Sequence, residues 1–430
     1  AGHQAELHHP GVWVKNVLIH HAAARLGGAA YHLAVDTDEP KHLNLRWPSA
    51  NEPLTDDSAL ATAAWVGMVG APTPLHLMKL QEKLRDAASK WSFEPCAFDV
   101  LRSMRRLLLE SPRLPQWLVN SEHEFEWSLG LRHHALVVSP LWTCEPYAVF
   151  VYHVLARACA FAADYNVCLA DYRREHTIRS PGRPMPDLRV TTESCEMPFW
   201  LDDLSTGTRT RARVGRRPGS FCVLTTSDDR DEFALDPRAD GWDAASALLA
   251  FLRRHDLRLS PRAITLTTFA RLALADQFVH GIGGGRYDQV TDRLIARFFK
   301  LQPPHFSVTT ATLYFPDAVG RSRACLPCVA QDGHRLRHGL LGDRKRELLR
   351  EINASPRNSP RRRQVFSDMH RQLSVAALAS PALKRWEQRL AEAESDARQD
   401  ELLFDRELFF ALQPRDRLEA LIARYAAMFQ

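Results

Sequence analysis

Hydrophobic side chains near the start of the chain are spaced first as in a helix and then as in a strand. Between Pro10 and Leu26 they recur at steps of three and four residues, which predicts a helix with one buried face. Pro10 suits a first helical turn, and Gly27 with Gly28 suits a helix end. The apolar segment 30–35 indicates a strand. We expect most of a β-α-β unit, whose first strand begins before Ala1.

A second informative pattern lies between residues 260 and 301. Helical spacing at Thr268–Ala275 is followed by the short apolar strand Phe278–His280 and by a glycine-rich turn at Gly281–Gly285. The amphipathic pattern at Asp288–Lys300 then predicts a helix. We therefore expect a turn with almost no side chains that opens a helix.

The other segments complete an α/β prediction. Amphipathic helices are expected at Leu75–Lys90 and Phe98–Glu110. The predicted divisions are 1–60 (first part of the core), 61–135 (helical insertion), 136–190 (core strand and helices), 191–240 (small β-rich insertion), 241–335 (second part of the core, with the glycine-rich turn) and 336–430 (helical C-terminal region).

Composition places the chain among soluble globular proteins. It has 430 residues, 45% of them hydrophobic and 25% charged, which suits two to three domains. There is no run of 18 apolar residues and no secretory signal pattern, so neither a membrane span nor export is expected. Cysteines occur at positions 96, 144, 159, 168, 195, 222, 325 and 328. This scatter is typical of reduced thiols, and we expect a cytoplasmic protein.

The net charge of +5 gives no general electrostatic argument for nucleic-acid binding, which is therefore not expected. Two arginine-rich stretches, 209–217 and 361–363, lack the interleaved aromatic residues of single-strand binders. We interpret them as solvated surface.

Residues suited to phosphate surround the start of the first predicted helix. They are Gly2, His3, Gln4, His9, Pro10, Gly11 and Lys15. A helix N-terminus attracts anions, and imidazole or ammonium groups there could stabilise a transferring phosphoryl group. A merely polar loop is the alternative.

Asp36 and Asp38 follow the next strand. Side chains two residues apart point to one side of an extended segment, so the two carboxylates could bind Mg²⁺ or accept a proton from an amine. Ordinary turn chemistry is the alternative.

The glycine-rich turn would let a ligand approach the backbone closely. Its candidate binding residues are Gly281, Gly283, Gly284 and Gly285. It matches neither a Walker loop nor the Gly-x-Gly-x-x-Gly fingerprint, so a structural turn is the alternative.

Two further clusters have candidate chemistry. Cys325, Cys328, His334 and His338 have zinc-ligand types, although the five-residue middle spacing also suits an ordinary loop. If their segment is helical, Arg173, His176 and Arg179 share one face and could hold a substrate carboxylate, with a surface ion-pair patch as the alternative.

Taken together, these motifs resemble those of the bacillithiol synthase family. The matching elements are Gly2-His3-Gln4, Pro10-Gly11 with Lys15, Asp36-Thr37-Asp38, and Gly283-Gly284-Gly285 before a helix. The resemblance implies a Rossmann-like parallel-sheet core, as in class I synthetases and nucleotidyltransferases, with helical insertions and a coiled-coil-like C-terminal region. It also implies binding of ATP or ADP with Mg²⁺ and ligation of an amino acid to a small-molecule acceptor.

We therefore predict a nucleotide-dependent ligase-like enzyme whose ligand lies between the start of the first helix and the glycine-rich turn. His9, Asp36 and Asp38 are its predicted catalytic residues. The alternative is a non-catalytic α/β scaffold that forms a homodimer through its C-terminal helices.

Overall fold

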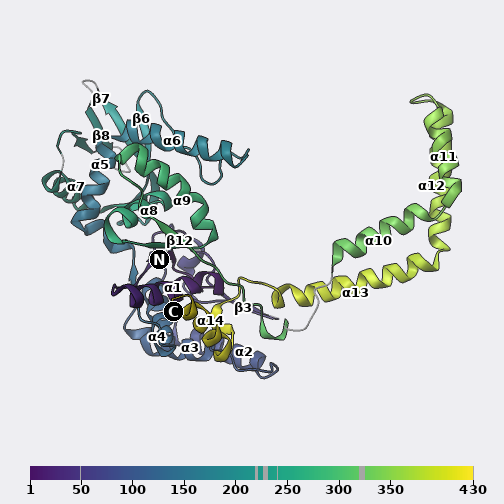
Figure 1. The fold of residues 1–430 in the computed structure, drawn as a ribbon, viewed down its shortest axis with the longest axis horizontal. Helices are drawn as coiled ribbons and strands as arrows, with labels where there is room; N and C mark the ends of the chain where they lie inside the picture. The colour runs from purple at the N-terminus through teal and green to yellow at the C-terminus, as the bar shows by residue number, and fades with distance from the viewer. Residues whose placement is uncertain (49, 218–220, 226–230, 240, 319–324, 430) are drawn as a thin grey trace. The chain divides into compact units, whose positions relative to one another are not determined.

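The computed structural model describes residues 1–430 apart from 49, 218–220, 226–230, 240, 319–324 and 430 (Figure 1). It is a mixed α/β protein, 57% helical, with small parallel sheets, which confirms the predicted class at that level. The chain divides into two compact units. Unit 1 comprises Ala1–Leu313 and Arg406–Gln430, and unit 2 comprises Tyr314–Asp405. Unit 2 is therefore inserted between two segments of unit 1.

A three-stranded parallel sheet begins unit 1. Its strands are β1 (Gly2–Gln4), β2 (Tyr31–Val35) and β5 (His134–Val137), with β2 in the middle. Helix α1 (Pro10–Leu26) connects β1 to β2 and has the bounds that its apolar spacing predicts. Gly27 ends the helix with a φ of 67°, a left-handed conformation that glycine adopts without a steric penalty. The predicted β-α-β unit is confirmed.

A second, two-stranded parallel sheet comes later in unit 1. Strand β11 (Phe278–His280) pairs with β12 (Phe306–Val308), and α9 (Ile282–Leu294) with the π-helical turn Ile295–Phe299 connects them. Helix α8 (Ala263–Phe269) precedes β11 and continues as another π-helical turn. The predicted strand at 278–280 is therefore present.

Four helices form a further part of unit 1. They are α2 (Pro74–Ala88), α3 (Ala97–Arg106), α4 (Leu114–Ser128) and, after unit 2, α14 (Arg415–Ala426), and the hairpin of β3 (Asn44–Trp47) and β4 (Ala50–Pro53) precedes them. Of these helices, α3 packs against α2 and α4, and α14 packs against α1. The returning chain completes this core, because the Phe410 ring stacks on that of Trp13 at 4.8 Å between centroids. Residues 406–430 are thus part of the architecture of unit 1.

An antiparallel sheet forms the rest of unit 1. Its strands, in spatial order, are β10 (Leu257–Pro261), β6 (Ser194–Asp203), β7 (Thr208–Arg217), β8 (Phe221–Thr225) and β9 (Glu232–Leu235). Helices α5 (Glu145–Ala156), α6 (Ala158–Glu175) and α7 (Trp242–Arg254) share a hydrophobic core with it. Among the described residues no single helix has both the length and the hydropathy of a membrane span. The bent pair α5 and α6, which meet at 88°, has them only when taken together.

A buried ion-pair cluster corrects the interpretation of one arginine-rich stretch. The Asp202 carboxylate, fully buried, accepts hydrogen bonds from Arg209 Nε at 2.6 Å and Arg258 Nη2 at 2.9 Å. Arg209 also lies over the rings of Trp65 and Trp200. Arg209 lies on β7, the middle strand of the sheet, where its guanidinium contacts Asp202 and the two tryptophan rings in place of water. It is therefore a structural residue and not a solvated surface residue.

Unit 2 consists of helices that pack in pairs. α10 (Leu326–Gly339) packs against α13 (Pro381–Leu403), and α11 (Gly342–Ala354) packs against α12 (Pro360–Leu378), as Figure 1 shows. The core of the second pair is Leu348, Ile352, Val365 and Met369. In the first pair, the Trp386 indole donates to the Val329 carbonyl at 2.7 Å.

Candidate functional site

A cavity of about 510 Å³ lies at the carboxyl ends of β1, β2 and β11 and at the N-terminal ends of α1 and α9. Small-molecule sites in proteins have volumes of about 300–1,000 Å³, and open α/β sheets bind ligands at this edge. The lining includes these predicted site residues: Gly2, His3, Gln4, His9, Gly11, Lys15, Asp38, Gly281, Gly283 and Gly284. Pro10, Asp36 and Gly285 lie outside it. The fold thus brings the two predicted ligand-binding segments together.

His9 caps the N-terminus of α1 at the cavity wall. Its Nδ1 accepts a hydrogen bond from the Gly11 backbone N–H at 3.1 Å, so Nε2 carries the ring hydrogen. Burial, and then the charge of Arg406, lower the pKa of His9 to about 4. His9 is therefore a neutral N–H donor at pH 7. The first backbone N–H groups of α1 are already paired, because Val12 and Trp13 both donate to the His9 carbonyl, so the side chain of His9 and the helix dipole are what this helix end offers a ligand.

Lys15 is a buried amine that lines the same cavity. Its side chain is almost fully buried, and Nζ donates to the Gly2 carbonyl at 2.8 Å. Burial lowers the pKa of Lys15 to about 7, although the Glu6 carboxylate opposes this. An anion in the cavity would favour the charged amine, so Lys15 can respond to ligand charge near neutral pH.

Acidic side chains contact two histidines that precede α1. His3 Nδ1 lies 3.3 Å from Glu6, and His8 Nδ1 lies 3.0 Å from Glu122 of α4. Burial alone would lower the pKa of His8, but the Glu122 carboxylate outweighs it and the pKa is raised. The start of α1 is therefore supported by the buried contact of His8 with Glu122 as well as by packing.

Asp36 and Asp38 do not point in the same direction, contrary to the prediction. Strand β2 ends at Val35 and residues 36–38 form a turn, so the alternation of an extended segment does not apply. Asp36 Oδ1 accepts from the Ser139 backbone N–H at 2.7 Å, whereas Asp38 Oδ2 accepts from Gln4 Nε2 at 2.7 Å beside the cavity. Asp36 thus holds the loop after β5, and Asp38 is the carboxylate that lines the cavity.

The glycine-rich segment is helical where a turn was predicted. Gly281 is the N-cap of α9, which begins at Ile282 instead of near Asp288. A Cβ at Gly284 would lie 2.6 Å from His280 Nδ1, and one at Gly285 would lie 2.4 Å from Val308. Close packing of the first turn of α9 on β11 and β12 overrides the low helix propensity of glycine. The first turn of a second helix therefore borders the cavity.

His280 is a cavity residue that the sequence analysis did not select. Its Nε2 lies 2.8 Å from Asp288 Oδ2, and Arg271 Nη1 donates to the same oxygen at 2.7 Å. Burial would raise the pKa of Asp288, but the contacts with His280 and Arg271 lower it, so the carboxylate stays ionised. An ionised carboxylate that orients an imidazole is the arrangement of a general base. No local pattern in the sequence marks this pair, because it forms only when α9 packs on β11.

Arg406 and Thr310 also line the cavity and were not selected. Arg406 Nη2 donates to Thr310 Oγ1 at 3.3 Å, although the two residues are 96 positions apart. No spacing in the sequence indicates this contact.

The predicted substrate residues Arg173, His176 and Arg179 do not line the cavity. Helix α6 ends at Glu175, so the three residues do not share a helical face. Arg173 instead donates to the Pro181 and Met185 carbonyls and pairs with Asp187 at 2.8 Å. It orders the loop after α6.

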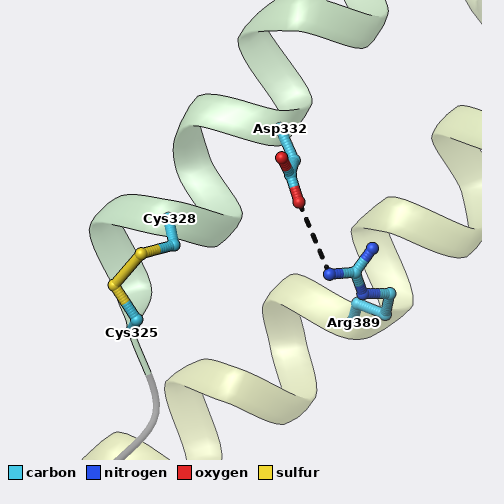
Figure 2. The surroundings of a disulfide bond; sticks show 4 residues. All are labelled: Cys325, Cys328, Asp332 and Arg389. Atoms are coloured by element: carbon cyan, nitrogen blue, oxygen red, sulfur yellow. Dashed lines mark ion pairs between the residues drawn. A yellow bond between two sulfur atoms is a disulfide. The ribbon is translucent and has the colours of Figure 1, made fainter.

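The Cys/His stretch lies in unit 2. Cys325 and Cys328 form a disulfide at the start of α10, near the ion pair of Asp332 with Arg389 (Figure 2), so the prediction of reduced thiols is wrong for this pair. His334 and His338 face each other one turn apart on α10, with their Nε2 atoms 2.8 Å apart. Within the described ranges, no group of three or more His, Cys, Asp or Glu side chains could hold a metal ion. Disulfide sulfurs are not thiolate ligands, so Cys325 and Cys328 could bind zinc only after reduction of this bond.

Comparison with models of known protein families gives no match, and neither does a search of curated protein sequences.

Proposed function

We propose that unit 1 is a nucleotide-dependent ligase-like enzyme that joins an amino acid to a small-molecule acceptor, cysteine being one candidate. The observation that carries the proposal is the convergence on one cavity of two helix N-termini, the Lys15 amine and the Asp38 carboxylate. Helix N-termini and a lysine attract phosphate, and a carboxylate can bind its Mg²⁺. The same segments carry the resemblance to the bacillithiol synthase family, which supports carbon–nitrogen bond formation.

The two parallel sheets are, in this proposal, halves of one Rossmann-like core. Joined side by side they would have the strand order β5-β2-β1-β11-β12, which is the 3-2-1-4-5 order of that fold. Two contacts support the junction: a Cβ at Gly2 would lie 3.4 Å from the Phe278 ring, and Ala1 shares a hydrophobic cluster with Val279. The cavity would then lie where the direction of strand progression reverses, the usual ligand position.

Phosphate binding is assigned to the α1 side. The positive end of the α1 dipole, with the His9 Nε2–H and the Lys15 amine, is suited to the outer phosphates of ATP or ADP. Asp38, with Gln4, is suited to hold Mg²⁺ beside them. When bound, the nucleotide supplies the energy that activates the substrate carboxylate.

Proton transfer is assigned to the α9 side. His280 is oriented through Nε2 by Asp288, which leaves Nδ1, next to Gly284, to accept a proton from the attacking amine. Asp288 is itself held by Arg271 and stays ionised, so it can stabilise the imidazolium that forms.

A calorimetric titration of MgATP and MgADP into the full chain tests the proposal. The His9→Ala variant should bind about tenfold more weakly, equivalent to about 1.4 kcal/mol. Thr73→Ala is the matched control, because Thr73 caps α2 outside the cavity and its loss removes a comparable helix cap. Absence of binding to the wild type, or equal weakening by the two variants, would contradict the proposed function.

A second candidate function is pairing of two chains through unit 2. Helix α12 exposes Phe366, Val375 and Leu378, whose exposed fractions are 52%, 64% and 78%. Val375 and Leu378 are three residues apart and share one face of the helix, and adjacent exposed apolar side chains of this kind favour a partner surface. Light scattering should then give twice the mass of one chain and, for Leu378→Lys, a single mass. A monomeric wild type would reject this candidate.

A further inference from the structure

Two cysteines away from the cavity lie almost within bonding distance. Cys159 Sγ, at the start of α6, is 3.3 Å from Cys195 Sγ on β6. A disulfide bond is about 2.05 Å long, so these are two thiols in contact. They are 36 positions apart in the chain, and their meeting follows from the packing of α6 on β6.

The two sulfur atoms have different surroundings. Cys159 is partly exposed and its Sγ accepts two hydrogen bonds, from Arg216 Nε at 3.1 Å and from the Cys195 thiol. Arg216 comes from β7, and its Nη2 lies 3.9 Å from Cys195 Sγ. A guanidinium donor favours negative charge on the sulfur that it contacts.

Cys195 is buried in the core next to β7. Burial, and then its hydrogen bond to Cys159, raise the pKa of Cys195 to about 11. At neutral pH it therefore keeps its proton, which it directs to the Cys159 sulfur. Cys159 is thus a partly exposed sulfur that contacts a guanidinium group, and Cys195 is a buried, protonated thiol.

We propose that Cys159 and Cys195 form a peroxide-reactive dithiol centre, in which Cys159 is the attacking thiolate, Cys195 the resolving thiol and Arg216 a positioning residue. Its oxidant is a small hydroperoxide that reaches Cys159 from the exposed Arg216 side.

The reaction has two steps. The Cys159 thiolate attacks the terminal oxygen of the hydroperoxide, so a sulfur–oxygen bond forms, the oxygen–oxygen bond breaks, and the leaving alkoxide takes a proton to become an alcohol. The Cys195 sulfur then attacks the sulfenic sulfur of Cys159; the sulfur–sulfur bond forms, and hydroxide leaves with the Cys195 proton as water. Two thiols are oxidised and one hydroperoxide is reduced, and the new disulfide joins α6 to β6.

Peptide mapping after oxidation tests the proposal directly. The reduced full chain is treated with one equivalent of hydrogen peroxide, alkylated and cleaved with trypsin without reductant. We expect a linked pair of the peptides 158–173 and 190–209. Because Cys168 shares the first peptide, Cys168→Ser is the matched control and should give the same link.

Single variants separate the roles of the two thiols. Cys195→Ser should stop at a sulfenic acid on Cys159 that dimedone labels, and Cys159→Ser should give neither the label nor the link. Arg216→Gln should slow the reaction about tenfold, as expected for loss of a charged hydrogen bond. Arg216 is exposed, so the variant should keep the fold, which circular dichroism checks.

The exposed thiol of Cys144 is the internal reference for reactivity. If Cys144 is oxidised as fast as Cys159, or if the linked peptides do not form while Cys144 reacts, the assignment of a dithiol centre is wrong. An unchanged rate in Arg216→Gln would overturn the role of Arg216 in the centre.

Discussion

Replacing Lys15 by methionine should make the ligand-free protein more stable at neutral pH while weakening nucleotide binding. Burial lowers the Lys15 pKa from 10.5 to about 7. At about 1.4 kcal/mol for each pH unit, the buried charged amine destabilises the fold by about 5 kcal/mol. Loss of its hydrogen bond to Gly2 offsets about 1–2 kcal/mol of this. The net gain for Lys15→Met below pH 7 is therefore about 3 kcal/mol.

The stability of the wild-type protein should increase with pH, because the Lys15 pKa is lowered in the folded protein. Between pH 7 and about pH 10 the unfolded chain keeps the Lys15 proton that the folded protein has released, so wild-type stability rises with pH over this interval. The difference in free energy of unfolding between Lys15→Met and the wild type should shrink across the same interval. At its upper end the variant should be slightly less stable than the wild type. Wild-type affinity for MgADP should fall above pH 7, as the charged amine is lost, whereas the affinity of the variant should be low and lack this dependence.

Urea unfolding at pH 6, 8 and 10, together with calorimetry of MgADP, measures both effects. Lys79→Met is the control, because Lys79 is exposed on α2 outside the cavity. Its stability should stay within about 0.5 kcal/mol of the wild type. A Lys15→Met variant that is less stable than the wild type at pH 6, or a difference that does not vary with pH, would refute the reasoning.

Two further pairs of variants separate ligand contacts from structural contacts. Gly284→Ala should slow ligation at least about tenfold and leave MgADP affinity nearly unchanged, because its Cβ would displace His280, the proposed base. Gly339→Ala on α10, outside the cavity, where a Cβ meets nothing within 4 Å, should behave like the wild type. Equal ligation rates of the two variants would contradict the role of His280. Asp36→Ala should lower the free energy of unfolding by about 1–3 kcal/mol, because a buried backbone N–H loses its acceptor. Asp38→Ala should instead lose the Mg²⁺ dependence of nucleotide binding with little change in stability. Thermal unfolding and calorimetry compare the two variants. If Asp36→Ala loses the Mg²⁺ dependence and Asp38→Ala loses stability, the two assigned roles are wrong.

Elements of the fold could be predicted from the sequence where the local spacing of residues determines the structure. The bounds of α1 follow from its apolar face, Pro10 and Gly27, and these are local signals. The position of Asp36 could not be predicted, because its alternation with Asp38 assumes a strand that in fact stops at Val35.

Contacts between distant segments account for the other differences. His280 follows two buried apolar residues and has the pattern of an ordinary strand end, so its ion pair becomes visible only when α9 packs on β11. Strand β10 (Leu257–Pro261) is buried at every position, which gives it no alternation, and its partner β6 lies more than fifty residues earlier. The His280–Asp288 pair and the position of β10 beside β6 both depend on packing between segments, and local sequence patterns do not indicate that packing.

The hydrogen bond between Arg406 and Thr310 has a consequence for how this chain could have been assembled. Thr310 and Arg406 lie close to the two points at which the chain leaves and re-enters unit 1. The Nη2 atom of Arg406 lies 3.3 Å from the Oγ1 atom of Thr310. A short loop could therefore replace residues 314–405 without stretching the ends. A gene insertion or deletion at this point changes the chain by a whole helical module and leaves the rest of unit 1 continuous. Because Thr310 and Arg406 both stay in unit 1, a chain without residues 314–405 should keep the lining of the cavity.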